Sequence, residues 1–281
     1  MFYFFCVRFH FTMNQFQKAY IFYGKTDIMK VILKSFQTEA DMAEFEEILA
    51  SRAAEAEIPL TAEQIAQFGI YNALLVEWNT RMNLTALTTP EDVAVKHIID
   101  SLTAYDPALF GGARTLIDVG TGAGLPGIPL ALYAPHIEVT LMDALQKRVK
   151  FLTEAVRAMN LPNVRCIHAR AEEAARQKEH RGVYDLAVSR AVARMPVLLE
   201  YMLPFVRVGG AVLALKGRAY EEEAQEARGA AARLGGGRVT SRLVHLPGLD
   251  DVRAILTVVK ERPTPKGYPR RAGQPEQNPL K

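Results

Sequence analysis

One segment organises the chain: Thr115-Leu116-Ile117-Asp118-Val119-Gly120-Thr121-Gly122-Ala123-Gly124-Leu125-Pro126-Gly127-Ile128-Pro129-Leu130. A short apolar run leads into glycines at alternate positions, and two prolines then open a second apolar run. This order predicts a strand, a tight turn and the start of a helix. Glycine suits such a turn because it adopts backbone angles closed to other residues and lets a ligand approach the main chain. We therefore predict a nucleotide-type binding turn.

Two ligand patterns overlap in this turn. Residues 122–127 satisfy the dinucleotide pattern G-x-G-x-x-G, which is a weak signal by itself. The second pattern begins at Asp118, with glycines at every second position after it, and is typical of Rossmann-like methyltransferases that use S-adenosylmethionine. The dinucleotide pattern starts late for a strand that ends near Val119, and Pro126 has no amide hydrogen to offer a pyrophosphate. We favour S-adenosylmethionine; a turn without a ligand is the remaining alternative.

The composition is that of a globular α/β protein. With 281 residues, 49% of them hydrophobic, the chain can hold one α/β domain and a smaller helical unit. No apolar run is long enough to span a bilayer. Cys6 and Cys166 cannot build a disulfide framework or a zinc site by themselves, so we expect a reducing compartment and no metal.

The first forty-one residues differ in composition from the rest. Aromatic residues crowd this segment, whereas alanine, which is abundant later, occurs there only at Ala19 and Ala40. Arg8 interrupts the apolar run and no small-residue cleavage site follows, which does not fit a signal peptide. We expect residues 1–41 to be an atypical extension and the functional chain to begin near Met42. N-terminal sequencing of the native protein tests this expectation.

Residues 42–110 have a helical pattern. A capping box opens at Thr61, and apolar residues then recur at spacings of three and four, at Phe68, Tyr71, Leu75 and Trp78. Thr89 caps a second helix, which carries His97 and Asp100 on one face. These two side chains could form a catalytic pair, but we interpret them as a hydrogen-bonded packing pair.

Strand and helix patterns alternate over residues 111–261, which predicts a parallel sheet with crossover helices. The predicted strands after the glycine turn are 138–143, 163–168, 184–190 and 209–217, and an antiparallel pair at 242–246 and 253–259 closes the sheet. Asp143 ends the second strand, where an acid can accept hydrogen bonds from ribose hydroxyls; a helix N-cap is the alternative. Arg190 and Lys216 leave strands at the same edge and would meet a polyanionic substrate, unless acids or solvent neutralise them.

Residues 262–281 form a basic tail that we expect to be too rich in proline to fold as a regular element. Five basic residues against Glu276 give this segment a formal net charge of +4, so the rest of the chain, at −1 of the total of +3, is close to neutral. With Tyr268 it suits phosphate contacts and base stacking, and a disordered end is the alternative.

Together these motifs resemble the bacterial ribosomal RNA small-subunit methyltransferase G family (RsmG, also called glucose-inhibited division protein B). The motifs follow the family's order from about Met42 to the end, at residues 75–79, 83–85, 97–101, 118–127, 189–193 and 265–270. The resemblance implies a Rossmann-like class I S-adenosylmethionine-dependent methyltransferase sheet with helices on both faces, preceded by a small helical unit.

The resemblance also implies a reaction, the transfer of a methyl group from S-adenosylmethionine to N7 of a guanine in 16S rRNA, guanine 527. The family's cofactor contacts carry over to Gly120, Leu125, Ala171, Glu172 and Arg190. We add Asp143 from its place at the end of the second strand. The implied partner is 16S rRNA in the small ribosomal subunit or an assembly intermediate, and we expect a cytoplasmic monomer with no membrane partner.

Guanine N7 carries a free lone pair at neutral pH, so its methylation needs no base to remove a proton. Alignment of N7 with the sulfonium methyl can supply about 7–11 kcal/mol of the barrier. We therefore assign no catalytic residue. Two alternatives, a nicotinamide-dependent oxidoreductase and a non-catalytic RNA-binding protein, are separated from this function by calorimetry with S-adenosylmethionine and NAD.

Overall fold

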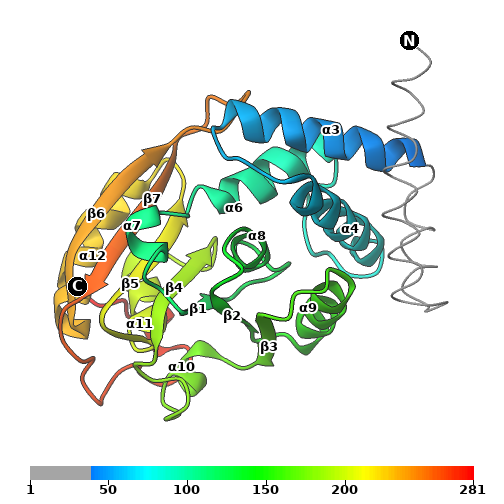
Figure 1. Cartoon of the computed structure of the whole chain (residues 1–281). Helices are drawn as coiled ribbons and strands as arrows, with labels where there is room; N and C mark the ends of the chain where they lie inside the picture. Colours follow the sequence, from blue (N-terminus) through cyan, green and yellow to red (C-terminus); the bar gives the residue numbers. More distant parts are fainter. Residues whose placement is uncertain (1–38) are drawn as a thin grey trace, which may run out of the picture.

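The computed structural model describes residues 39–281, so the expected extension lies outside the described residues except for its last three positions. A helical unit forms the N-terminal part of the described chain (Figure 1). Its helices are α3 (Glu39–Glu55), α4 (Ala62–Asn79), α5 (Pro90–Asp92), the π-helix η1 (Val93–Ile99), α6 (Asp100–Leu102) and α7 (Pro107–Phe110). The predicted caps are confirmed, because Thr61 forms a complete capping box with Gln64 and Thr89 accepts from the amide of Asp92.

A seven-stranded sheet forms the centre of the molecule (Figure 1). Its strands are β1 (Thr115–Val119), β2 (Glu138–Asp143), β3 (Val164–His168), β4 (Tyr184–Arg190), β5 (Val206–Lys216), β6 (Gly236–Val244) and β7 (Arg253–Lys260). The order is β3-β2-β1-β4-β5-β7-β6, with β1 to β5 parallel and β7 antiparallel to both of its neighbours. The strand order reverses between β1 and β4, and ligands bind in the crevice at such a point.

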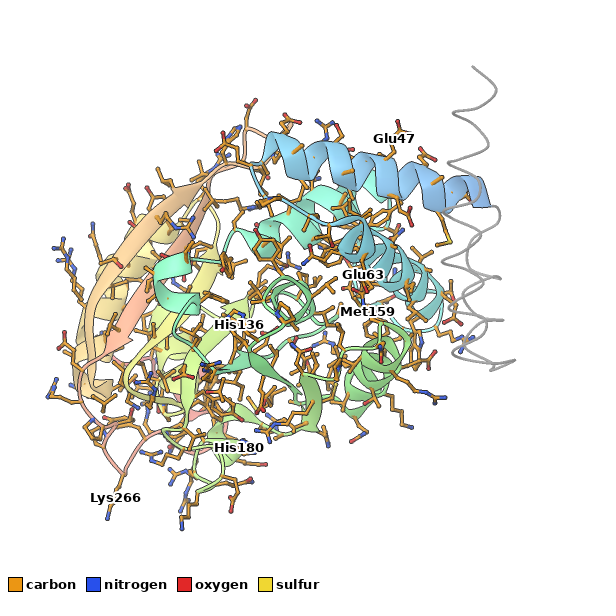
Figure 2. The ribbon with its side chains drawn as sticks, in the orientation of Figure 1. Glu47, Glu63, His136, Met159, His180 and Lys266 are labelled. Carbon is orange, nitrogen blue, oxygen red and sulfur yellow. The ribbon has the colours of Figure 1, made fainter. Side chains whose placement is uncertain are left out.

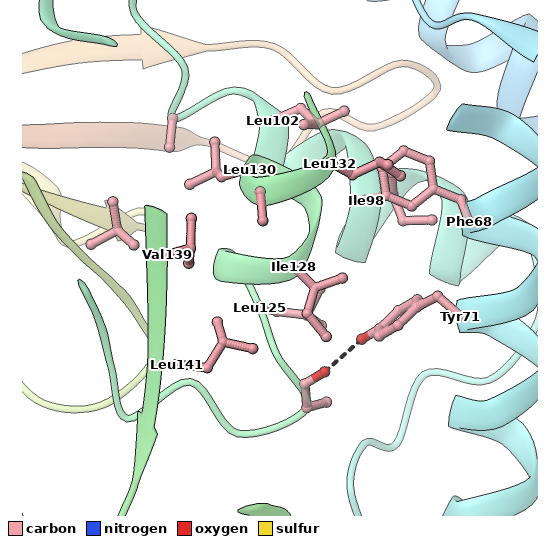
Figure 3. Packing of buried hydrophobic residues seen from close by; sticks show 14 of the residues in the cluster. Phe68, Tyr71, Ile98, Leu102, Leu125, Ile128, Leu130, Leu132, Val139 and Leu141 are labelled. Atoms are coloured by element: carbon pink, nitrogen blue, oxygen red, sulfur yellow. Dashed lines mark hydrogen bonds between the residues drawn. The ribbon is translucent and has the colours of Figure 1, made fainter. Parts of the chain in front are cut away.

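Helices cover both faces of the sheet, as predicted. They are α8 (Gly127–Tyr133), α9 (Gln146–Ala158), α10 (Ala171–Ala174), α11 (Met195–Met202) and α12 (Tyr220–Leu234). Successive residues of a strand point to opposite faces of the sheet. Leu116 therefore joins the core beneath the helical unit, α8 and α9, whereas Ile117 joins the core beneath α11 and α12. Figure 3 shows part of the first core, where Phe68 of α4 packs near Ile98. The Rossmann-like α/β fold is confirmed.

Two strands start earlier than predicted. β5 begins at Val206 rather than Gly209, and β6 begins at Gly236 rather than Arg242. The predicted strand at 209–217 already contains Gly210, where a Cβ would lie 2.3 Å from the carbonyl oxygen of Asp185 in the neighbouring strand. Glycine is therefore needed here for close strand packing and does not mark a turn.

The C-terminal tail corrects another expectation. It contains a short helix, α13 (Gln274–Gln277), and folds back against the body of the protein. Arg181 donates to the carbonyl oxygens of Tyr268 and Thr264 at 2.8 and 3.0 Å, and the buried carboxylate of Glu200 accepts from Arg270. These partners are far apart in the sequence, so proline content alone did not reveal them. Lys266 points outward from this tail (Figure 2).

Among residues 39–281, none of the helices combines the length and the apolar character that a membrane span requires.

Candidate cofactor site

The turn after β1 has the geometry that its glycines predict. Gly120, Gly122 and Gly124 have φ angles of 71°, 61° and 89°, in the left-handed region that favours glycine. A Cβ on Gly120 would also lie 2.7 Å from Cγ2 of Val192, in the loop after β4. The turn therefore needs glycine both for its backbone angles and for the close approach of the neighbouring loop.

Two buried carboxylates anchor the turn. Oδ2 of Asp118 accepts from Oγ1 of Thr121 at 2.6 Å and from the amide of Gly127 at 2.7 Å. Oδ2 of Asp143 accepts from the amide of Gly122 at 3.0 Å. Burial raises the pKa of Asp118 to about 7, although the two hydrogen bonds oppose the shift. Oδ1 of Asp118 has no partner among the described residues, so the site keeps one unpaired buried acceptor.

Asp143 is not the N-cap of α9, because the cap position is Leu145 and no side chain caps the helix there. Its Oδ1 accepts from the amide of Leu145 at 2.9 Å, next to the start of α9, so the carboxylate orders the entry to that helix. Its Oδ2 faces Gly122 and, at 3.4 Å, a guanidinium nitrogen of Arg148. The contact of Asp143 with a ribose stays a prediction.

The remaining predicted cofactor residues lie at the same edge of the sheet, because parallel strands end together there. Leu125 is buried in the glycine turn, and Ala171 begins α10 after β3. Glu172 is also buried, and its Oε1 accepts from the amide of Gly273 in the tail at 3.3 Å. The fold thus collects the predicted residues from four neighbouring strands, β3, β2, β1 and β4. Their contact with a cofactor stays a prediction.

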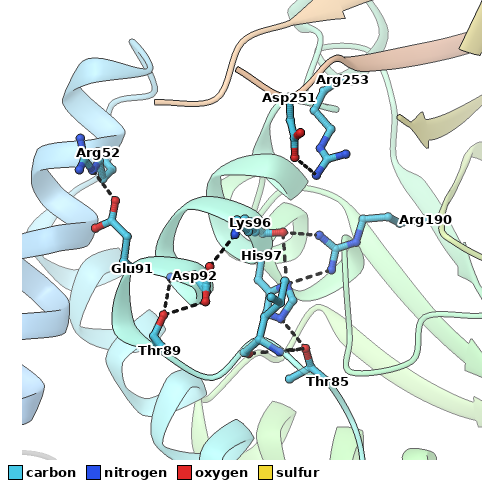
Figure 4. A network of polar contacts seen from close by, with 11 residues as sticks. Arg52, Thr85, Thr89, Glu91, Asp92, Lys96, His97, Arg190, Asp251 and Arg253 are labelled. Atoms are coloured by element: carbon cyan, nitrogen blue, oxygen red, sulfur yellow. Dashed lines mark hydrogen bonds and ion pairs between the residues drawn. The ribbon is translucent and has the colours of Figure 1, made fainter. Parts of the chain in front are cut away.

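Arg190 links the sheet to the helical unit (Figure 4). Its Nη1 lies 2.8 Å from both Oδ2 of Asp100 and the carbonyl oxygen of Lys96. Its Nη2 lies 3.4 Å from Nδ1 of His97, whose Nε2 lies 2.9 Å from Oγ1 of Thr85. The side chains of Asp100 and His97 therefore both contact Arg190 and share no hydrogen bond with each other among the described residues, which corrects their interpretation as a hydrogen-bonded side-chain pair.

Lys216 is also neutralised inside the protein. Its Nζ lies 2.7 Å from Oε2 of Glu223 and donates to the carbonyl oxygen of Ala193 at 2.6 Å. The expectation that Arg190 and Lys216 together meet a polyanion is therefore wrong, because each already has a carboxylate partner. Arg170 after β3 and Arg218 after β5 are exposed at this edge and have no carboxylate partner within the described chain. Sequence reasoning missed both, although Arg218 directly follows a predicted strand and Arg170 lies two residues after one.

His97 provides a pH-dependent prediction. Burial and the charge of Arg190 lower its pKa to about 4, below the ordinary value of 6.5. The unfolded chain then binds more protons between pH 6.5 and 4, so this group's contribution to stability is complete above pH 6.5 and is lost as the pH falls towards 4. In this window, we expect His97→Gln to remove a pH dependence of the free energy of unfolding of up to about 1.4 kcal/mol per pH unit. Urea unfolding at pH 7.5, 6 and 5 measures it.

The effect of His97 is isolated by the difference in the free energy of unfolding between the wild type and His97→Gln. Taking this difference is necessary because Asp118 gives both proteins a pH dependence of the opposite sign. The raised pKa of Asp118 gives a contribution that is complete below its ordinary value of 3.8 and is lost as the pH rises through about 7. His168→Gln, at an exposed position, is the matched control. A difference between wild type and His97→Gln that stays constant with pH would rule out the titration of His97.

Comparisons with known proteins agree on one family. A sequence model described as rRNA small subunit methyltransferase G (GidB) matches residues 64–246. The ribosomal RNA small subunit methyltransferase G of Alkaliphilus metalliredigens is 45% identical over 218 residues, covering 78% of this chain and 91% of the relative. The protein of that name from Leuconostoc citreum is 48% identical, covering 80% and 95%, and that from Clostridium botulinum strain Alaska E43 is 45% identical, covering 84% and 99%.

Among solved structures, the apo form of the S-adenosylmethionine-dependent methyltransferase SibL is similar with a TM-score of 0.46 at 14% identity, covering 87% of this chain and 77% of that chain.

Proposed function

Because this chain belongs to the rRNA small subunit methyltransferase G family, we propose that it transfers a methyl group from S-adenosylmethionine to N7 of a guanine in 16S rRNA, guanine 527. The observation that carries the proposal is the glycine turn, which lies at the switch point of the sheet and is held from below by Asp118 and Asp143. The substrate would be the small ribosomal subunit or an assembly intermediate, and the protein would act as a cytoplasmic monomer.

The site fits S-adenosylmethionine better than a dinucleotide. The open face of Gly122 has no atom within 4 Å of a Cβ position, so a ligand can lie against the main chain there. Pro126 has no amide hydrogen where a dinucleotide's pyrophosphate would need a donor, and S-adenosylmethionine has no phosphate. In this proposal Gly120 and Leu125 contact the cofactor from the turn, and Asp143, Ala171, Glu172 and Arg190 contact it from the following strand ends.

The chemistry needs orientation more than proton transfer. Bound S-adenosylmethionine supplies an electrophilic methyl group on a sulfonium sulfur. Guanine N7 offers its lone pair directly, so the bond from sulfur to carbon breaks as the bond from N7 to carbon forms, and no proton leaves the base. Asp118 is fully buried behind the turn, and His97 faces Thr85 and Arg190. Neither is positioned as a general base, which supports catalysis by alignment.

Exposed cations support a polyanionic substrate at this edge. Arg170 and Arg218 border the predicted cofactor site, and Arg271 extends from the part of the folded tail next to Gly273, whose amide donates to Glu172. Side chains of this kind bind phosphates and determine the position of a nucleic acid rather than its sequence. The proposed RNA-binding role therefore rests on these cations and no longer on Lys216.

The deciding experiment measures transfer of labelled methyl from S-adenosylmethionine to small ribosomal subunits from cells that lack this gene. Mass spectrometry of the digested RNA should then reveal 7-methylguanosine. Subunits from cells that express the gene are the matched control, since their site is already methylated and should accept little label. Cofactor binding without label in the RNA would move the substrate to another molecule.

The absence of a general base leads to a kinetic prediction. At saturating cofactor and subunits, kcat should change less than about threefold between pH 6.5 and 8.5, since no essential group has to lose or gain a proton. Circular dichroism at each pH serves as the control for folding. A kcat that rises tenfold per pH unit through neutrality would contradict alignment-only catalysis.

A further inference from the structure

A polar stripe on α4 binds the main chain of the methyltransferase domain. Gln64, Gln67 and Tyr71 are spaced by three and four residues, so they share one face of the helix. Nε2 of Gln64 donates to the carbonyl oxygen of Leu132 at the end of α8 at 3.1 Å. Nε2 of Gln67 donates to the carbonyl oxygen of Met159 after α9 at 2.8 Å, and Met159 lies beside α4 in Figure 2. The stripe thus docks the helical unit onto backbone groups of the domain that carries the sheet.

The last residue of the stripe reaches the glycine turn. The hydroxyl of Tyr71 donates to the carbonyl oxygen of Ala123 at 2.8 Å (Figure 3). Tyr71 is fully buried, and burial raises its pKa above the ordinary range, so the hydroxyl stays protonated and keeps donating. The hydrogen bond joins residues 52 positions apart in the sequence.

Ala123 lies between Gly122 and Gly124, which both have positive φ angles and no side chain of their own. Asp143 holds the amide of Gly122, and Asp118 holds Thr121 and Gly127. Both carboxylates accept hydrogen bonds from N–H or O–H groups of the turn, and they do so from the side of the sheet. Among the described residues, Tyr71 donates a hydrogen bond to a carbonyl oxygen of the turn from the side of the helical unit. Glycine loses more conformational freedom on ordering than other residues, so an extra anchor has a large effect here.

We propose that Tyr71 is a positioning residue, which holds the Gly122–Gly124 segment of the turn in its binding conformation before the cofactor arrives. This inference rests on the proposed function, since it assumes that the turn binds S-adenosylmethionine. A ligand that meets an ordered turn does not have to order it on binding, so its affinity is higher. Removal of the hydroxyl should therefore weaken cofactor binding and leave the methyl-transfer step nearly unchanged.

The test is Tyr71→Phe, which removes the hydroxyl and keeps the ring. We expect the Kd and the KM for S-adenosylmethionine to rise about three- to tenfold, the range of one ordinary hydrogen bond, while kcat changes less than twofold. Tyr184→Phe is the matched control, because Tyr184 is also buried and its hydroxyl bonds Arg165 and His180 at the start of β4, away from the turn. The control should lower thermal stability without changing the Kd.

Hydrogen exchange gives an independent measurement, and its wild-type part does not depend on whether Tyr71→Phe folds. In the cofactor-free wild type, the amides of Gly124 and Leu125, which bond to Thr121, should exchange slowly, and in Tyr71→Phe they should exchange faster than the amides of β7. Fast exchange in the free wild type, or an unchanged Kd in a folded Tyr71→Phe, overturns the role of Tyr71. No binding of S-adenosylmethionine to the wild type would instead overturn the proposed function.

Discussion

Gly120→Ala is expected to lower kcat/KM for methyl transfer about a hundredfold, the effect that a displacement of roughly 1 Å in a reacting site produces. Gly120 has a φ of 71°, where a Cβ costs about 1–2 kcal/mol. That Cβ would also lie 2.7 Å from Cγ2 of Val192, so the turn after β1 and the loop after β4 would have to move apart. Both segments border the predicted cofactor site.

Gly182→Ala provides the matched control for backbone strain. Gly182 has a φ of 67°, has no atom within 4 Å of a Cβ position, and precedes β4 at the other end of the sheet. The Gly182→Ala variant should lose about as much free energy of unfolding as Gly120→Ala, while its kcat/KM stays near that of the wild type. Steady-state kinetics and urea unfolding of both variants separate the two effects. Equal kcat/KM values for the two variants would show that Gly120 has no special place in the site.

Arg270→Ala is expected to lower the free energy of unfolding by about 3–5 kcal/mol, the usual effect of removing one partner from a buried ion pair. Glu200 is completely buried. Its Oε1 accepts from the amide and Nε of Arg270 at 2.7 and 2.9 Å, and its Oε2 accepts from Nη2 at 2.7 Å. Without the guanidinium, the chain must bury an uncompensated carboxylate or release the tail.

Arg271→Ala is the matched control, because Arg271 is the next residue, is exposed, and has no ion pair within residues 39–281. Its free energy of unfolding should stay within about 0.5 kcal/mol of the wild type. Adding Glu200→Gln to Arg270→Ala should recover part of the loss, because the buried negative charge is then gone. If urea unfolding gave the same stability for Arg270→Ala and Arg271→Ala, the tail would not be held by this pair.

The elements of this protein follow from local patterns. Strands β2 and β4 have the predicted bounds. Strand and helix periods differ, and caps and glycines act within a few residues of the positions they affect. The glycine turn could be recognised for the same reason, since its backbone angles depend on which residues lack a Cβ.

The partners of the charged and polar side chains could be identified only from the tertiary structure. Arg190 meets Asp100 across 90 positions and Arg270 meets Glu200 across 70, so neither pair leaves a periodic signal in the sequence. A cation that looks free in the sequence is neutralised once folding places a carboxylate within 3 Å, and a tail that looks disordered is held once its arginine finds a buried acid. Local conformational preferences were sufficient to predict the glycine turn and most of the strands and helices, whereas the charge of the site depends on distance and burial, which exist only in the folded chain.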